Sequence, residues 1–480
     1  MNRRRFIKAS AATAFLSPWL VGVQRRGSRP PNVILVLVDD MGWTGLSVTM
    51  DDRFPEARSD FYQTPRIAAL ARQGMRFSDA YSPGSMCIPS RAAILTGKTP
   101  AQLHMTTPGP RQRARAWQKL QPPAHTTELP TREATIAELL HTRGYATAHF
   151  GKWHLGRANP GRHGFDEHDG STGNGGDGAL KDPNPKDVFG ATARASAFIS
   201  KQTAQAKPFY CQISHYSLHE PIEALSTSVQ RFEKLPRGRR HSNPEYAAMT
   251  YDLDTAVGRL LDHLDKLGIA DQTYVIFMSD NGAGAKRRSR QTNAPLASGK
   301  GSLHEGGIRV PLIVCGPNTK AGSTCHTPVT GCDLLPTICE LAGVRKVPKA
   351  VEGMSLVPLL RGKGVLPGGT TRELVFHTPH YGLGPRQLPQ SAIRVGDLKL
   401  LVDLESGTAR LFDLRHDIGE ARDLSARMPE EALALRQRLD ARLARIGAQL
   451  ATPNATYDPA AVRTRRRPGD RSGRAKRGGR

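Results

Sequence analysis

The chain has 480 residues, of which 38% are hydrophobic, and a formal net charge of +25 at pH 7. This length suggests two or three domains, and the composition is that of a globular protein with a large core rather than of a chain too polar to fold. Part of the charge lies at the ends, because residues 463–480 hold nine Arg or Lys and the first eight residues hold four. A basic body suits an anionic substrate, but net charge bears on encounter and solubility and assigns no chemistry.

The first residues are typical of an export signal. Asn2-Arg-Arg-Arg-Phe-Ile-Lys8 precedes an Ala-rich apolar segment, a pattern that resembles a twin-arginine signal. A membrane anchor is the alternative, but Pro18 interrupts the apolar segment, which is shorter than the ~20 residues of a spanning helix. We therefore expect residues 1–28 to be an export signal read by the twin-arginine machinery. The protein would be periplasmic or extracellular, without a stable membrane span.

Strands and helices are predicted to alternate along most of the chain. The continuous apolar run at 33–38 is typical of a strand buried on both faces of a parallel sheet. Further strands are predicted at 145–150, 208–214, 273–278 and 312–315. Helices are predicted at about 64–72, from Pro89 onward, and at 133–143, 192–206, 244–267 and 333–342. This alternation predicts an α/β fold with a large, mainly parallel sheet flanked by helices.

The pattern changes at about residue 362. A Pro- and Gly-rich linker leads to short strand-like runs at 373–377, 391–395, 399–402 and 410–414, and to a helix at 429–450. These runs predict a smaller C-terminal α+β domain with an antiparallel sheet. We expect domains at 29–362 and 363–456, followed by a basic, disordered tail at 457–480. For this tail we favour a solvated terminus and expect no nucleic-acid partner.

Polar residues follow several of the predicted strands directly. In open α/β sheets, ligands bind in the crevice at the carboxyl ends of the strands, so we expect these residues to converge there. The seven residues are Asp39, Asp40, Lys152, His154, His219, Asp280 and Asn281. Each one alone is more often an ordinary loop residue, but that explanation is a poor one for all seven together.

Four of these residues carry hard oxygen ligands. Asp39, Asp40, Asp280 and Asn281 offer three carboxylates and one amide oxygen, which suit Ca²⁺ or Mg²⁺ far better than zinc. The amide oxygen and the flexible set favour Ca²⁺, with Mg²⁺ as the alternative.

Cys87 lies just ahead of the helix predicted to begin with Pro89. A helix N-terminus favours anions, so the thiol is a candidate nucleophile with a lowered pKa. The alternative is an inert, buried cysteine, which is the commoner case. If Cys87 is consumed by modification, five of the six cysteines remain, and an odd number argues against a full disulfide framework. One bridge among Cys325, Cys332 and Cys339 stays open.

Six motifs resemble those of the sulfatase family, in the same order along the chain. They are Pro31-Asn-Val-Ile, Asp39-Asp-Met-Gly-Trp43, Cys87-Ile-Pro-Ser-Arg91, Gly151-Lys-Trp-His-Leu-Gly156, Ser279-Asp-Asn-Gly282 and Lys300-Gly-Ser-Leu-His-Glu-Gly-Gly-Ile-Arg309-Val-Pro311. The resemblance spans about residues 31–424 and implies the alkaline-phosphatase-like fold. It also implies that Cys87 is oxidised to formylglycine by a sulfatase-maturing enzyme.

The resemblance implies a role for each site residue. Asp39, Asp40, Asp280 and Asn281 would bind the divalent cation, usually Ca²⁺. Residue 87, as the hydrated formylglycine, would attack sulfur while Arg91 holds the hydrate and Lys152 and His154 steer its hydroxyls. His219 and Lys300 would contact the sulfate and help the leaving oxygen depart.

The leading hypothesis is therefore an exported sulfuric ester hydrolase that acts on an aryl sulfate or a sulfated carbohydrate. The nearest alternative is a phosphate or phosphonate monoester hydrolase, because fold does not fix function. A third is a non-catalytic binder of sulfated glycans. No motif identifies the substrate, although six further residues are candidates to line the pocket: His168, Asp169, Asn174, His377, His380 and Arg386.

Overall fold

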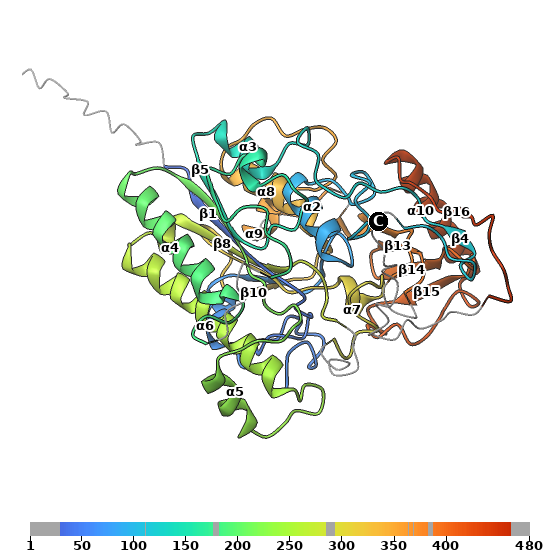
Figure 1. The fold of residues 1–480 in the computed structure, drawn as a ribbon, viewed down its shortest axis with the longest axis horizontal. Coiled ribbons are helices and arrows are strands. Elements are labelled where there is room, and N and C mark those ends of the chain that lie inside the picture. The colour runs from blue at the N-terminus through green and yellow to red at the C-terminus, as the bar shows by residue number, and fades with distance from the viewer. Residues whose placement is uncertain are drawn as a thin grey trace, which may run out of the picture.

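The structure is a computed structural model that describes residues 29–110, 112–175, 182–284, 293–362, 364–367, 369–382 and 387–461 (Figure 1). The predicted export signal at 1–28, Arg386 and the tail beyond residue 461 lie outside these residues. Among the described helices, none combines the length and the apolar composition that a membrane crossing requires.

An eight-stranded sheet forms the centre of the larger part of the protein. Its strand order is β10-β2-β9-β8-β1-β7-β5-β6. The strands are β1 Asn32–Val38, β2 Met75–Phe77, β5 Ala146–Gly151, β6 Glu167–His168, β7 Phe209–Ser214, β8 Thr273–Ser279, β9 Leu312–Cys315 and β10 Ser323–Cys325. β1 pairs in parallel with β7 and β8, whereas β9 is antiparallel to β8 and β2. The predicted α/β fold with a mainly parallel sheet is confirmed.

Helices cover both faces of this sheet (Figure 1). The even-numbered apolar residues of β1 share a core with α1 Pro65–Gln73, α4 Val188–Ala204 and α6 Pro244–Lys266. Its odd-numbered residues share a core with α2 Cys87–Thr96, α3 Ile136–His141 and α8 Leu334–Leu341. Since successive side chains of a strand point to opposite faces, a strand between two helical layers must be apolar throughout, as the run at 33–38 predicted.

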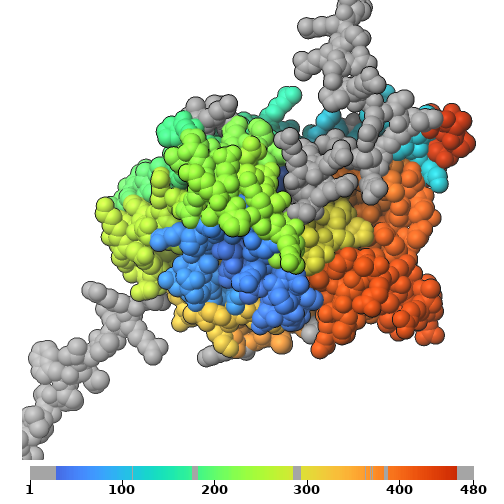
Figure 2. Space-filling model, turned by 90° about the horizontal axis from the view of Figure 1, so that it is seen from below, coloured from blue at the N-terminus to red at the C-terminus, as the bar shows by residue number. Residues whose placement is uncertain are grey.

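A second sheet of four antiparallel strands lies near the C-terminus. Its strands, in spatial order, are β12 Glu373–Thr378, β13 Gln390–Val395, β14 Leu398–Asp403 and β15 Ala409–Asp413. One face packs on α10 Pro429–Arg445, and the other shares a core with Tyr81, Leu303 and Ile308 of the larger part. Figure 2 shows this C-terminal part, in orange, against the yellow segment around residue 300. The smaller antiparallel sheet is therefore confirmed, while the domain bounds stay a prediction.

Several helix boundaries differ from the prediction, and α4 begins at Val188 rather than at residue 192. α2 begins at Cys87 rather than Pro89, because the N–H groups of the first helical turn have no intrahelical partner and a proline is tolerated anywhere in it. α3 begins only at Ile136, after a capping box at Thr135, and α10 already ends at Arg445. The remaining short elements had no clear sequence pattern: β3 Ala80–Tyr81, β4 Leu120–Gln121, α5 Ser226–Glu233, α7 Glu305–Ile308, β11 Val329–Thr330, α9 Val357–Leu360 and β16 Thr452–Pro453.

All six cysteines are free thiols. The bridge left open among Cys325, Cys332 and Cys339 is therefore not formed. Cys211 is buried in β7, whereas Cys315 at the end of β9 is only partly buried.

Candidate active site

The strand-end residues lie together at the carboxyl edge of the central sheet. Asp39 and Asp40 directly follow β1, Asp280 and Asn281 follow β8, and Lys152 follows β5. Because β7 and β8 flank β1 in parallel and β5 is parallel to β7, these strands all end at the same edge. Asp40 has a φ of 58°, a conformation that aspartate tolerates better than most residues and that turns the chain sharply after the strand.

Three carboxylates and one amide form an acidic cluster. The Asp40 N–H donates to Asp280 Oδ1 at 3.2 Å, and Asn281 Nδ2 donates to Asp40 Oδ1 at 2.7 Å. One ligand atom from each of Asp39, Asp40, Asp280 and Cys87 lies within 4.8 Å of the others. Burial raises the pKa of Asp280 to about 6, and the nearby charge of Asp39 acts in the same direction. The cluster therefore concentrates negative charge that needs cations around it.

Each carboxylate has its own cationic partner. Lys152 Nζ donates to Asp39 at 2.5 Å, Arg91 Nε to Asp280 at 2.8 Å, and Lys300 Nζ to Asp40 at 2.6 Å. Burial alone would favour the neutral form of Asp39, but Lys152, Arg91 and Lys300 outweigh it and hold the pKa of this carboxyl well below its usual range.

Further contacts position these cations. Arg91 also donates to the backbone carbonyl of Lys152 at 2.7 Å. Gln387 donates to the backbone carbonyl of Lys300 at 2.7 Å and so ties this segment to the C-terminal part.

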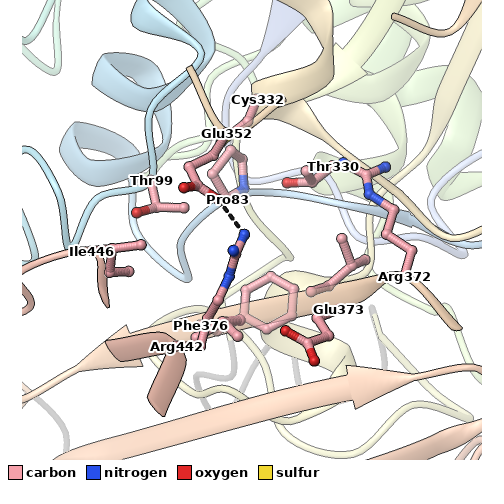
Figure 3. Close-up of a pocket in the computed structure, with 12 residues that line it drawn as sticks. Pro83, Thr99, Thr330, Cys332, Glu352, Arg372, Glu373, Phe376, Arg442 and Ile446 are labelled. Atoms are coloured by element: carbon pink, nitrogen blue, oxygen red, sulfur yellow. Dashed lines mark hydrogen bonds and ion pairs between the residues drawn. The ribbon is translucent and has the colours of Figure 1, made fainter. Parts of the chain in front are cut away.

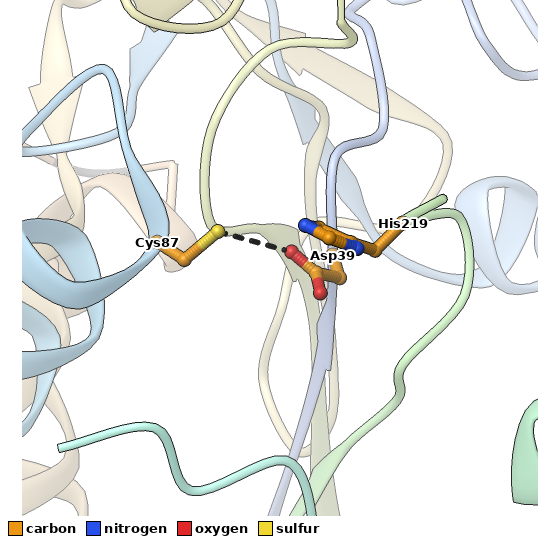
Figure 4. Close-up of side chains that lie close together, drawn as sticks. All are labelled: Asp39, Cys87 and His219. Atoms are coloured by element: carbon orange, nitrogen blue, oxygen red, sulfur yellow. Dashed lines mark hydrogen bonds between the residues drawn. The ribbon is translucent and has the colours of Figure 1, made fainter. Parts of the chain in front are cut away.

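Cys87 points from the start of α2 into the cluster (Figure 4). Its Sγ lies 3.3 Å from Asp39 Oδ1 and 3.1 Å from Lys300 Nζ, and its side chain is buried. The predicted lowering of its pKa is wrong: burial, followed by the charge of Asp39, raises the pKa of the thiol despite Lys152 and Lys300. The helix N-terminus favours the thiolate, but this effect on the pKa is outweighed because a thiolate here would be buried beside carboxylates.

The two predicted histidines differ in their surroundings. His219 lies on the loop after β7, with a ring nitrogen within 4.8 Å of Asp39 and Cys87 (Figure 4). His154 has a buried Nδ1 without a hydrogen-bond partner among the described residues, and its backbone N–H donates to Thr172. Burial and the charge of Lys152 lower the pKa of His154 to about 3, so its ring is neutral at physiological pH.

The residues suggested to line the pocket do not lie together in one place. Asp169 is bound by Arg194 and by the Gly151 N–H, His168 bonds within its own turn, and Asn174 is exposed. His380 contacts Thr106 at 2.8 Å, whereas His377 lies within the C-terminal part, bound to Ser391 and Gln449.

Two residues at the cluster were missed by sequence reasoning. Tyr246 of α6 donates its hydroxyl to the backbone carbonyl of Asp40 at 3.2 Å, and Ser82 donates to the backbone carbonyl of Asp280. Ser82 belongs to the stretch around Cys87 and could have been included. No sequence signal identifies Tyr246, because its helix carries only the ordinary amphipathic pattern.

A separate cavity lies at the junction with the C-terminal part (Figure 3). Arg442 of α10 and Glu352 form an ion pair across it, and Phe376 of β12 forms part of its wall. Its volume of ≈ 30 Å³ has room for about one or two water molecules. The cluster around Cys87, rather than this cavity, is therefore the candidate active site.

Comparisons with known proteins agree with this arrangement. The Sulfatase family profile matches residues 31–344, and the profile described as N-sulphoglucosamine sulphohydrolase, C-terminal, matches residues 299–449. Arylsulfatase A of Homo sapiens is 32% identical over 394 residues, which cover 74% of this chain and 71% of that protein. N-acetylgalactosamine-6-sulfatase of Mus musculus is 31% identical over 374 residues, with coverages of 70% and 67%.

Two solved structures share the fold of this chain. Ps i-CgsB in complex with k-i-k-neocarrahexaose has a TM-score of 0.71 at 26% identity, over 86% of this chain and 93% of that chain. The phosphonate monoester hydrolase SpPMH from Silicibacter pomeroyi, at 19% identity and a TM-score of 0.62, shares the fold over 89% of this chain and all of its own. Since the Sulfatase profile covers well over half of the sequence and arylsulfatase A aligns with 74% of it, the chain belongs to the sulfatase family of sulfuric ester hydrolases.

Proposed function

We propose that this protein hydrolyses sulfate esters through a formylglycine at position 87 and a divalent cation at the acidic cluster. The observation that carries the proposal is the place of Cys87 Sγ, 3.3 Å from Asp39 and 3.1 Å from Lys300. A hydroxyl of the hydrated aldehyde would stand where this sulfur stands. There it would lie beside an ammonium group that can neutralise a sulfate oxygen.

The residues present fit a divalent cation. Asp39, Asp40, Asp280 and Asn281 offer only oxygen ligands, and the buried Oδ1 of Asn281 has no hydrogen-bond partner among the described residues. A buried amide oxygen left unpaired costs free energy, which a bound cation would recover. The flexible oxygen set favours Ca²⁺ over Mg²⁺. When bound, the ion would neutralise the carboxylates and polarise a sulfate oxygen.

In the first chemical step, one hydroxyl of the hydrated formylglycine attacks the sulfur atom and the ester S–O bond breaks. Arg91 and Lys152 hold the hydrate, and Lys300 stabilises the charge on the sulfate oxygens, as fixed cations do in such sites. His219, whose ring lies within reach of residue 87, takes the proton of the attacking hydroxyl and passes it to the leaving alcohol. The product of this step is the alcohol and a sulfate ester on residue 87.

In the second step, the remaining hydroxyl of residue 87 loses its proton and its oxygen forms the aldehyde carbonyl. The C–O bond to sulfate breaks, and sulfate leaves with the electron pair. His154 is the proton acceptor in this proposal, because its ring is neutral at physiological pH and its Nδ1 has no hydrogen-bond partner among the described residues. Water then hydrates the aldehyde, so that one water is consumed for each ester hydrolysed.

Substrate and cellular setting are part of the proposal. The relatives named arylsulfatase A and N-acetylgalactosamine-6-sulfatase favour an aryl sulfate or a sulfated carbohydrate. A sulfatase-maturing enzyme would oxidise Cys87, and the twin-arginine machinery would export the folded protein to the periplasm or beyond.

The test uses full-length protein coexpressed with a sulfatase-maturing enzyme. Intact mass and peptide mapping should show the aldehyde at residue 87, and the protein should release inorganic sulfate from 4-nitrophenyl sulfate. Cys87→Ala should lower kcat on the order of 10⁴-fold, because removing a nucleophile eliminates the covalent route. Cys315→Ala, at a partly buried thiol away from the cluster, is the matched control and should stay active.

Paired phosphate and phosphonate esters separate this proposal from its nearest alternative. If 4-nitrophenyl phenylphosphonate were turned over faster than 4-nitrophenyl sulfate, the assignment to sulfate esters would be wrong. An unmodified Cys87 in protein that binds sulfated glycans without turnover would instead support the non-catalytic binder.

A further inference from the structure

Lys186 is a buried cation that the proposed reaction does not use. The residue is only 3% exposed, yet its ammonium group makes no hydrogen bond or ion pair with any described residue. Lysine is rarely buried without a partner, because an isolated ammonium loses its hydration. Lys152 and Lys300, by contrast, each contact a carboxylate of the acidic cluster.

The turn that carries Lys186 is held by side chains. Lys186 and Asp187 both have left-handed backbone conformations, with φ of 53° and 52°. Asn184 donates to Asp187 Oδ1 at 2.8 Å and accepts hydrogen bonds from the Phe189 and Gly190 N–H groups. Two adjacent non-glycine residues in this region cost free energy, so the surrounding contacts must enforce the conformation.

A chain of contacts leads from this turn to the active site. Arg194 bonds to both Asp187, at 2.6 Å, and Asp169, at 2.6 Å. Asp169 in turn accepts the N–H of Gly151 at 2.7 Å, and Gly151 directly precedes Lys152. The turn is thus fixed to the end of β5, beside the residues that would handle the sulfate.

Several charged groups act on Lys186, and those of the active site are among them. Burial lowers the pKa of Lys186 and the nearby Lys152 acts in the same direction, while Glu223 and Asp39 oppose them. Asp39 is already paired with Lys152, and Asp187 with Arg194. Glu223, four residues after His219, has a buried Oε2 without a hydrogen-bond partner among the described residues. The charge of Glu223 thus acts on Lys186, although the two side chains form no ion pair.

We propose that Lys186 binds a second anionic group of the substrate, a carboxylate or a second sulfate, next to the ester that is hydrolysed. This inference rests on the proposed function. The cations that contact the acidic cluster serve the scissile sulfate and the carboxylates. Among the described residues Lys186 has no ion-pair partner, and its turn is fixed to the end of β5 next to Lys152, which suits an anion that arrives with the substrate. Lys186 is thus a residue for specificity rather than for the chemical step.

The test compares matured wild-type protein with Lys186→Met, Lys186→Arg and Lys207→Met. Lys207 is exposed and precedes β7, at the opposite edge of the sheet, so Lys207→Met removes the same charge away from the site. The substrates are a sulfated uronic acid, a disulfated hexosamine and singly charged 4-nitrophenyl sulfate. The quantity measured is the ratio of kcat/KM for each doubly charged substrate to that for 4-nitrophenyl sulfate.

We expect Lys186→Met to lower this ratio about tenfold or more for at least one doubly charged substrate, mainly through KM, because a charged hydrogen bond is lost. Lys186→Arg should keep most of the ratio and Lys207→Met all of it. Whichever doubly charged substrate is affected identifies the group as carboxylate or sulfate. In the wild type, kcat/KM should fall more steeply with salt for that substrate than for 4-nitrophenyl sulfate.

Two results would overturn the inference: an unchanged ratio in Lys186→Met, or a wild type with equal salt dependence for all three substrates. The salt series needs no variant, so it decides the question even if Lys186→Met does not fold. A wild type that hydrolyses none of the three sulfate esters would instead contradict the proposed function.

Discussion

Residue 87 lies between a carboxylate and an ammonium group, and its surroundings explain why a plain thiol would serve poorly there. Burial and Asp39 raise the pKa of the Cys87 thiol, so that little thiolate forms at neutral pH. A hydrated aldehyde needs no such ionisation before it binds, and the neighbouring cations can stabilise the charge that develops during attack. The same environment that disfavours the thiolate would therefore suit the formylglycine proposed at this position.

A substitution of Asn281, also at the scale of a single residue, would test the proposed metal site. Asn281→Ala removes the amide oxygen that has no hydrogen-bond partner among the described residues, and we expect the affinity for Ca²⁺ to fall by roughly tenfold or more, since even indirect contacts change metal affinity by about that factor. The measurement is the rise in melting temperature when Ca²⁺ is added to EDTA-treated protein, which reports binding to the folded state. Asn174→Ala, at an exposed position, is the control. Equal Ca²⁺-dependent shifts in both variants would exclude Asn281 as a ligand.

At the scale of elements, the short helix α3 depends on its first residue. The hydroxyl of Thr135 accepts the Glu138 N–H at 3.3 Å and donates to the backbone carbonyl of His163 at 2.7 Å, while Glu138 Oε2 accepts the Thr135 N–H at 2.9 Å. A helix of six residues has few internal hydrogen bonds, so this capping box supplies much of its stability. The box also explains why α3 begins later than its apolar pattern suggested.

Thr135→Ala should destabilise the protein by about 1–2 kcal/mol, because both the cap and the bond to the buried His163 carbonyl are lost. Thr135→Ser keeps the hydroxyl and should stay close to the wild type. Urea denaturation followed by circular dichroism gives the comparison. If both variants unfolded at the wild-type urea concentration, the cap would contribute nothing measurable.

At the scale of the whole molecule, buried ion pairs join the C-terminal sheet to the larger part. Asp79 accepts from Arg309 of the larger part at 2.8 Å and from Arg394 of β13 at 2.6 Å. Glu305 pairs with Lys399 of β14 at 2.8 Å, and Glu305 begins α7, which closely follows Lys300. The C-terminal sheet therefore helps to hold the segment that carries an active-site cation.

These pairs predict a loss of stability in acid. Burial raises the pKa of Glu305, but Lys399 and Arg309 outweigh it and lower the pKa from 4.5 to about 2. A carboxyl whose pKa is lower in the folded state stabilises the protein above its unfolded value, and this contribution is lost as the pH falls from 4.5 towards 2. The urea midpoint of the wild type should therefore drop over this range.

Glu305→Gln should have a lower midpoint than the wild type at pH 6 and a weaker dependence on pH between 4.5 and 2. Lys399 also pairs with Glu420 at 2.9 Å, so its charge still has a partner in this variant and the variant should fold. Glu431→Gln, at an exposed glutamate of α10, should follow the wild-type curve. Parallel curves for wild type and Glu305→Gln would contradict the assignment of this acid sensitivity to Glu305.

The sequence by itself determined the α/β architecture and the edge at which the site lies. Strand periodicity identified β1, β5, β7 and β8, and the carboxyl ends of parallel strands share one edge whatever the rest of the chain does. Asp39, Asp280 and Lys152 could therefore be grouped without coordinates. The motif around Cys87 added the residue that no strand-end argument would have included.

Only the tertiary structure decided which groups pair and which stay unpaired. Three features depend on contacts between segments far apart in sequence: the raised pKa of Cys87, the bond from the Tyr246 hydroxyl to the Asp40 carbonyl, and the lack of a partner for the Lys186 ammonium among the described residues. Desolvation and charge interactions act through space and depend on burial, whereas strand and helix patterns act along the chain. For this reason the sequence located the site, while the protonation and partners of its side chains required the folded protein.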